Sequence, residues 1–137
     1  MDGRGEPQWQ PISRMPFLTQ HITDGVKYAE ESLALFAQAR GSYRISDADV
    51  AGIVKTFTQS KADLVELYTE QGRRWQALDL GATRRKDVQR FVDLVAEELG
   101  LVEQILALAE ELKTWTIEAM LAKSDEQLGL EALLGKL

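Results

Sequence analysis

Residues 88–115 read VQRFVDLVAEELGLVEQILALAEELKTW, and this stretch carries the clearest structural signal in the chain. Apolar side chains recur there every three or four positions, which is the spacing of one face of an α-helix. This first stripe consists of Val88, Phe91, Val92, Val95, Leu99, Val102 and Leu106. No proline follows Pro16, and no segment alternates β-branched with polar residues, so the helical pattern extends outward in both directions. The sequence therefore predicts an all-α fold.

The ends of the helices are marked by capping residues and glycines. A first helix is expected over about residues 17–40 and a second over about 47–78, with Ser46 as its N-cap. A third is expected to begin after Thr83 and to extend as far as residue 123, although Gly100 leaves its continuity open. The second and third helices form a long antiparallel hairpin in this prediction, and the first packs on it as in a three-helix bundle.

The two ends of the chain differ from the middle. Residues 1–16 hold all three prolines together with Trp9, Ile12 and Met15, so we expect an extended arm that lies on a bundle surface. Residues 17–123 form the predicted bundle domain. The run Ser124-Asp-Glu-Gln has the spacing of a capping box and predicts a short docking helix within residues 124–137.

Composition excludes several classes of protein. The chain has 137 residues, a net charge of −6, no cysteine and one histidine. Disulfides, cysteine-ligated zinc and iron–sulfur clusters are thereby excluded, and an acidic chain is not expected to bind nucleic acid. No apolar signal segment is present, and no stretch approaches the roughly 20 uncharged residues of a membrane span. We therefore expect a cytoplasmic protein without a membrane segment, cofactor or metal.

Two of the predicted helices carry a second apolar stripe. On the first helix the stripe consists of Phe17, His21, Tyr28 and Leu35, and on the third of Leu101, Ile105, Leu108, Leu112, Trp115 and Ala119. A helix with two apolar faces needs a second partner, and another copy of the same chain is the simplest one. We therefore predict a homodimer whose interface comprises Leu101, Ile105, Leu108, Leu112 and Trp115, together with Leu130, Leu133 and Leu134 of the C-terminal segment. The alternative is that the arm and the last helix cover these faces within one subunit.

Acidic residues suggest a catalytic alternative. Asp63, Glu66 and Glu70 share one helix face, and an antiparallel hairpin brings Asp93 and Glu97 level with them. Carboxylates from two helices can bind magnesium, which is the basis of an all-α hydrolase hypothesis. The helical wheel directs both sets toward solvent, however, and a lone His21 carries no catalytic spacing, so the histidine is interpreted as the flank of an interface.

One local charge anomaly lies at the predicted hairpin tip. Residues 73–90 contain six basic and two acidic residues, while both flanking segments are acidic. Three of the cations occupy the first turn of a helix, where the helix dipole disfavours them. The candidate site for an anionic ligand consists of Arg73, Arg74, Trp75, Arg84, Arg85, Lys86 and Arg90.

These observations favour a non-catalytic helical protein–protein interaction module, such as an adaptor, scaffold or regulatory subunit. The alternatives are the magnesium-dependent hydrolase and a binder of an anionic ligand or nucleic acid through the basic tip.

Overall fold

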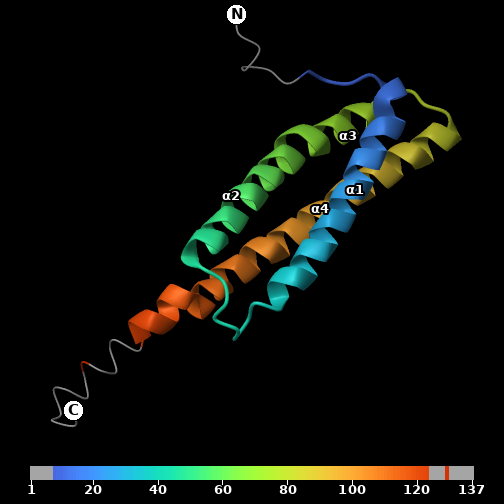
Figure 1. The fold of residues 1–137 in the computed structure, drawn as a ribbon. Helices are drawn as coiled ribbons and strands as arrows, with labels where there is room; N and C mark the ends of the chain where they lie inside the picture. Colours follow the sequence, from blue (N-terminus) through green and yellow to red (C-terminus); the bar gives the residue numbers. More distant parts are fainter. Residues whose placement is uncertain (1–7, 124–128, 130–137) are drawn as a thin grey trace, which may run out of the picture.

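The computed structural model describes residues 8–123 and residue 129, and it is all-α (Figure 1). Four α-helices lie between residues 8 and 112: α1 (Met15–Ala37), α2 (Asp47–Asp63), α3 (Thr69–Gln76) and α4 (Ala82–Leu112). No helix among the described residues is long and apolar enough to cross a membrane. The predicted C-terminal docking helix, with Leu130, Leu133 and Leu134, lies outside the described residues.

The sequence predicted one helix over residues 47–78, and this was wrong because a π-helical turn divides it. The turn is η2 (Leu64–Tyr68), which links α2 to α3. The Thr69 hydroxyl donates to the carbonyl oxygen of Leu64 at 2.8 Å, five residues back, which matches the wider turn. Turns of this kind often occur at functional sites.

The α4 helix runs without interruption through Gly100, but its ends differ from the prediction. It begins at Ala82 with Gly81 as N-cap, two residues before the expected cap at Thr83. It ends at Leu112 and not at residue 123, and the 3₁₀ turn η3 (Lys113–Trp115) and an extended Thr116 follow. The backbone N–H of Ile117 donates to the carbonyl oxygen of Ile45 at 2.9 Å, so a contact with the α1–α2 connection replaces helical hydrogen bonds. Residues 117–123 are helical again.

The start of α2 confirms the sequence prediction. Ser46 is the N-cap, its hydroxyl oxygen accepts from the Asp49 backbone N–H at 3.0 Å, and the Asp49 carboxylate accepts from the Ser46 backbone N–H. This reciprocal capping box satisfies two backbone donors that the helix itself leaves free.

The N-terminal arm is shorter than predicted and lies against α3 of its own chain. Residues 12–14 form the 3₁₀ turn η1 (Ile12–Arg14), and Met15 is already a buried residue of α1. Gln71 receives a hydrogen bond from the Gln10 backbone N–H at 2.7 Å and donates one to the Gln10 carbonyl oxygen at 3.2 Å. The indole N–H of Trp75 donates to the same carbonyl oxygen at 3.0 Å. These three hydrogen bonds fix the arm on α3.

The core is organised around α4, which contacts α1, α2 and α3 (Figure 1). Because α4 has neighbouring helices on different sides, it needs an apolar face toward each side. Both stripes of α4 therefore contribute to one core, which includes Phe91, Val95, Val102, Ile105, Leu108 and Leu112.

Candidate functional site

The predicted pairing stripe of α4 does not form a free surface. Ile105, Leu108 and Leu112 are at most 4% exposed within a single chain. Leu101 is partly buried against the same core, and the Trp115 ring packs edge-to-face on Tyr43 at 5.4 Å. The second apolar face of α4 does not need a second subunit, because the neighbouring helices of the same chain cover it. A homodimer through this stripe thus loses its physical basis, and the oligomeric state stays a prediction.

The second stripe of α1, by contrast, is exposed. Phe17, Tyr28 and Leu35 have relative exposures of 63%, 57% and 62%, and His21 on the same face is also exposed. At 100° per residue these side chains fall within about 40° of one another. The stripe predicted from the sequence is therefore a real apolar line on the surface of α1.

Three hollows follow this stripe along the junction between α1 and the antiparallel α2–η2–α3 segment. The first, of about 340 Å³, is lined by Phe17 and Leu18 of α1, by Leu67, Tyr68 and Gln71, and by the arm. The second, of about 320 Å³, is lined among others by His21, Asp24, Tyr28, Asp63, Tyr68 and Glu98. The third, of about 640 Å³, is lined by Leu35 and Phe36 of α1, by Ala39 just beyond the end of this helix, and by Ala48, Gly52 and Ile53 of α2. We call these three hollows together the α1–α2 groove.

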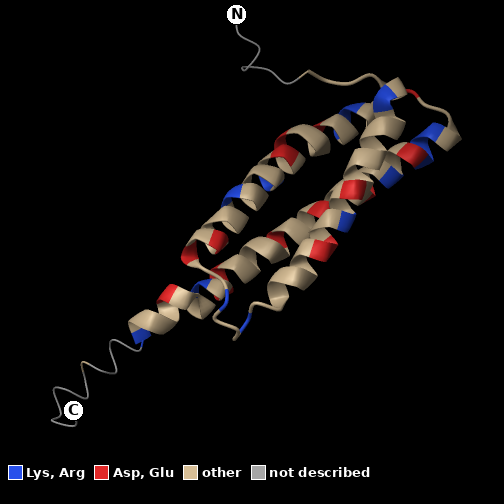
Figure 2. Cartoon of the chain, viewed as in Figure 1, with Lys and Arg blue, Asp and Glu red and all other residues tan. Residues whose placement is uncertain are grey.

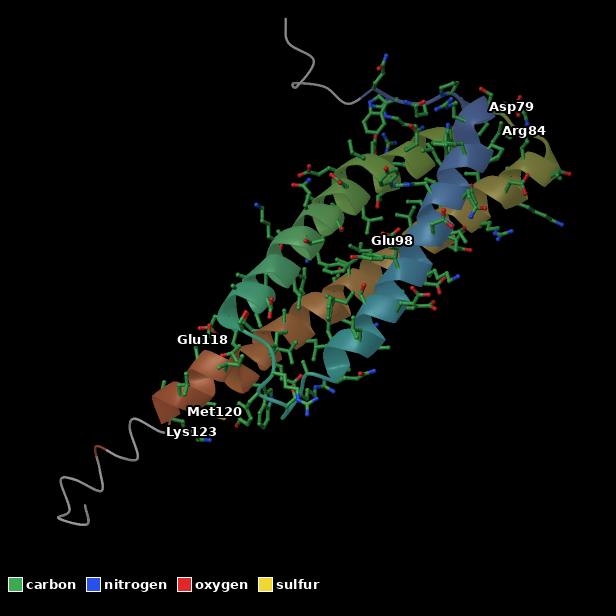
Figure 3. All side chains as sticks on the ribbon, in the orientation of Figure 1. Asp79, Arg84, Glu98, Glu118, Met120 and Lys123 are labelled. Carbon is green, nitrogen blue, oxygen red and sulfur yellow. The ribbon has the colours of Figure 1, made fainter. Side chains whose placement is uncertain are left out.

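Three carboxyl groups line the middle hollow. Glu98 comes from α4, Asp24 from α1 and Asp63 from the end of α2, so three elements each contribute one carboxyl group. Glu98 is half-buried, and burial raises the pKa of its carboxyl group to about 7. Figure 3 labels Glu98 midway along the molecule. A carboxyl group whose pKa is raised in this way changes its protonation state when a charged group is placed beside it.

A glycine in α1 makes room for the Glu98 carboxyl group. A Cβ atom built on Gly25 would lie 2.5 Å from Oε1 of Glu98, which is too close for any real side chain. The carboxyl group therefore occupies the space next to the α1 backbone.

Aromatic rings border the carboxyl groups of the middle hollow. The His21 and Tyr68 rings lie 5.7 Å apart, and Tyr28 stacks on Phe57 at 6.0 Å with an interplanar angle of 15°. Burial raises the pKa of the Tyr68 hydroxyl, and the negative charges of Asp63 and Glu98 raise it further. The walls of the hollow thus combine negative potential with aromatic faces.

Several residues of the candidate anion site at the basic tip already contact other residues of the same chain. Arg73 and Arg74 both form ion pairs with Glu70, and the Arg74 guanidinium lies 4.4 Å from the centre of the Trp9 ring. Trp75, which the sequence analysis included in this candidate site, is 2% exposed and therefore does not face a ligand there. Its ring packs edge-to-face on a buried aromatic side chain of α4.

The rest of the tip lies in the first part of α4, where basic residues gather (Figure 2), and its side chains are exposed. Arg85 donates to the carbonyl oxygen of Leu80 at 3.2 Å. Arg84, Lys86 and Arg90 have no ion-pair partner in the described part of the chain. The seven candidate residues therefore do not form one open anion site.

The carboxylates proposed for magnesium do not converge. Among the described residues, no group of three or more His, Asp or Glu side chains is arranged to hold a metal ion. Glu70 is paired with arginines, Glu66, Asp93 and Glu97 are exposed, and Asp63 lines the groove instead.

Sequence reasoning missed Glu98 and Tyr68 as site residues. The available signal was the position of Glu98 in the most buried stripe of α4, where Phe91, Val95, Val102 and Ile105 are its neighbours at helical spacing. A carboxyl group in the middle of an apolar stripe is unusual unless it has a specific role.

Comparison with known proteins adds no relatives. No family model, curated protein or solved structure matches the chain. The candidate function rests on the geometry alone.

Proposed function

We propose that the protein is a non-catalytic helical interaction module that binds an amphipathic helix of a partner protein in the α1–α2 groove. The scaffold in this proposal is a three-helix bundle, with the α2–η2–α3 segment and α4 as its hairpin and α1 packed against them. The observation that carries the proposal is the exposed line of Phe17, Tyr28 and Leu35 on α1.

The length and shape of the groove suit a helix. Phe17 and Leu35 are separated by about 27 Å along α1, which is the length of a helix of about 18 residues. Single exposed apolar side chains are common on protein surfaces, but an aligned series beside hollows is typical of a docking site. Helix-in-groove binding uses apolar anchors that are spaced in this way.

The walls of the groove are already shaped before a partner binds. Tyr28 is held by its stacking on Phe57, so little conformational freedom is lost when a partner contacts it. On the α2 side, Ala48 and Gly52 line the third hollow, and a Cβ atom built on Gly52 would meet nothing within 4 Å. Small residues at this wall leave room for bulky apolar side chains of the partner.

A second copy of the chain is a less suitable occupant. In a two-fold symmetric dimer the same patch meets itself, so the acidic middle hollow of one copy would face that of the other. Like charges that face each other disfavour such a pairing.

A selection experiment tests the proposal. A display library of helical peptides of about 18 residues is selected on the purified protein, and the enriched peptides are measured by fluorescence anisotropy. We expect the double variant Phe17→Ser/Leu35→Ser to weaken binding by about tenfold or more, which corresponds to about 1.4 kcal/mol. Leu78→Ser is the matched control, because Leu78 is 46% exposed but does not line the groove.

Two results would contradict the proposal. One is a selection that enriches no peptide, and the other is binding that the double variant leaves unchanged. A wild-type dimer that the double variant dissociates would assign the groove to a second copy.

A further inference from the structure

We infer that the partner helix carries a lysine or arginine at its centre, between two apolar anchors, and that this basic side chain enters the middle hollow beside Glu98. The inference rests on the proposed function, because it specifies the partner that the groove would bind.

The charges of the middle hollow point to a cation. Asp24, Asp63 and Glu98 all line it, and among the described residues no lysine or arginine does. A basic side chain placed there meets a carboxyl group from each of three elements, whereas an acidic one meets only repulsion. The rings of Tyr28 and Tyr68 add faces on which a guanidinium or ammonium group can lie.

Glu98 is the carboxyl group of this hollow that most clearly lacks a partner. Asp24 accepts a hydrogen bond from Gln20 at 2.8 Å, and Asp63 accepts one from Gln59 at 3.0 Å. For Glu98, no hydrogen bond or ion pair connects it to any other described residue. A half-buried carboxyl group without a partner is costly in its charged form, and the raised pKa of Glu98 reflects this. A bound cation would remove that cost, since it stabilises the carboxylate directly.

The position of the hollow fixes where the basic residue lies in the partner. Asp24 and Gly25 lie about two to three helical turns from both Phe17 and Leu35, which is roughly 10–16 Å along α1. A partner helix that lies along α1 therefore presents apolar residues to the outer hollows, and its basic residue lies about two turns from one apolar anchor and about three turns from the other. The chemical description of the partner is an amphipathic helix whose apolar face is interrupted by one central lysine or arginine.

The enriched peptides of the selection test this directly. We expect them to carry lysine or arginine at the central position of the apolar face. For one such peptide, norleucine in place of the central lysine keeps the alkyl chain and removes the charge. We expect this change to weaken binding to the wild-type protein by about tenfold.

A comparison of Glu98→Gln with Glu97→Gln shows whether the preference for lysine over norleucine depends on the carboxyl group in the middle hollow. Both variants remove one ionisable carboxyl group from the same helix, but Glu97 is exposed and does not line the hollow. We expect Glu97→Gln to keep the preference for lysine over norleucine, and Glu98→Gln to reduce it to about twofold or less.

The possible failures are distinguishable. Enriched helices with an apolar or acidic centre, or a lysine preference that Glu98→Gln leaves intact, would overturn this inference. The proposed function would still stand in that case if Phe17→Ser/Leu35→Ser abolished binding. If no peptide is enriched, both fail together.

Discussion

Replacing Glu98 by glutamine changes how the stability of the protein depends on pH. Glutamine resembles the neutral form of glutamic acid in shape and polarity and does not ionise. Since burial raises the pKa of Glu98 to about 7, the folded protein binds more protons at this site than the unfolded chain does, over the range from about pH 4.3 to 7. The contribution of Glu98 to the free energy of unfolding is therefore highest below about pH 4.3, falls as the pH rises to 7 and is constant above it.

The size of this effect follows from the shift of the pKa. At about 1.4 kcal/mol per unit, the shift from about 4.3 to 7 sets an upper limit of about 3.8 kcal/mol. Water screens a half-exposed carboxylate, which reduces the expected effect to about 1 kcal/mol. Glu98→Gln should therefore be more stable than the wild type by about 1 kcal/mol at pH 8, or by about 3 °C in melting temperature, and equally stable at pH 4.

Thermal and urea denaturation at pH 4, 6 and 8 measure this difference, with Glu97→Gln as control. Because all other titrating groups are common to the variants, their contributions cancel in the comparison. The control should stay within about 0.5 kcal/mol of the wild type at every pH. A Glu98→Gln variant that is less stable than the wild type at pH 8 would refute the reasoning, because it would mean that the charged carboxylate is stabilised within the fold.

Three further substitutions test the local geometry. Gly25→Ala should push the Glu98 carboxyl group into solvent, since the new Cβ atom would lie 2.5 Å from Oε1 of Glu98. In this background, thermal melts with and without Glu98→Gln should no longer show the pH-dependent difference in stability described above. A pH-dependent difference in stability that persists would mean that the Glu98 carboxyl group does not lie against Gly25. Gly72→Ala should lower the free energy of unfolding by about 1 kcal/mol, because its Cβ atom would lie 2.9 Å from Cγ2 of Val92 and crowd the α3–α4 contact. A gain in stability to urea would contradict that close approach. Ser46→Ala should cost about 1 kcal/mol through loss of the capping box, and an unchanged melting temperature would show that the cap is redundant.

The helical part of the fold could be predicted because local signals determine it. Apolar spacing and the absence of proline after Pro16 were enough to predict an all-α chain, and Ser46 marked the start of α2 as its N-cap. The π-helical turn at residues 64–68 had no comparable signal, because it contains no proline or glycine that would mark a change in the helix. The end of α4 was also misjudged, since the contact of Ile117 with Ile45 is not local in the sequence.

The candidate site could be predicted only in part. The helical wheel of α1 identified the exposed line of Phe17, Tyr28 and Leu35. The same method assigned Leu108 and Leu112 to a subunit interface, because a wheel shows how many apolar faces a helix has but not which helix covers each of them. The tertiary structure distinguishes the two helices. Neighbouring helices cover both apolar stripes of α4, whereas no described helix covers the outer apolar stripe of α1.

The central claim is that the α1–α2 groove is the docking surface, and a methyl NMR titration with a selected helical peptide tests it most directly. Leu18, Leu35 and Leu67 line the groove, while Leu78 and Leu121 are exposed outside it. Binding in the groove predicts that the methyl signals of the first three residues shift with the peptide concentration and that those of Leu78 and Leu121 stay in place. Shifts at Leu78 or Leu121 with unchanged signals from the groove leucines would contradict the account.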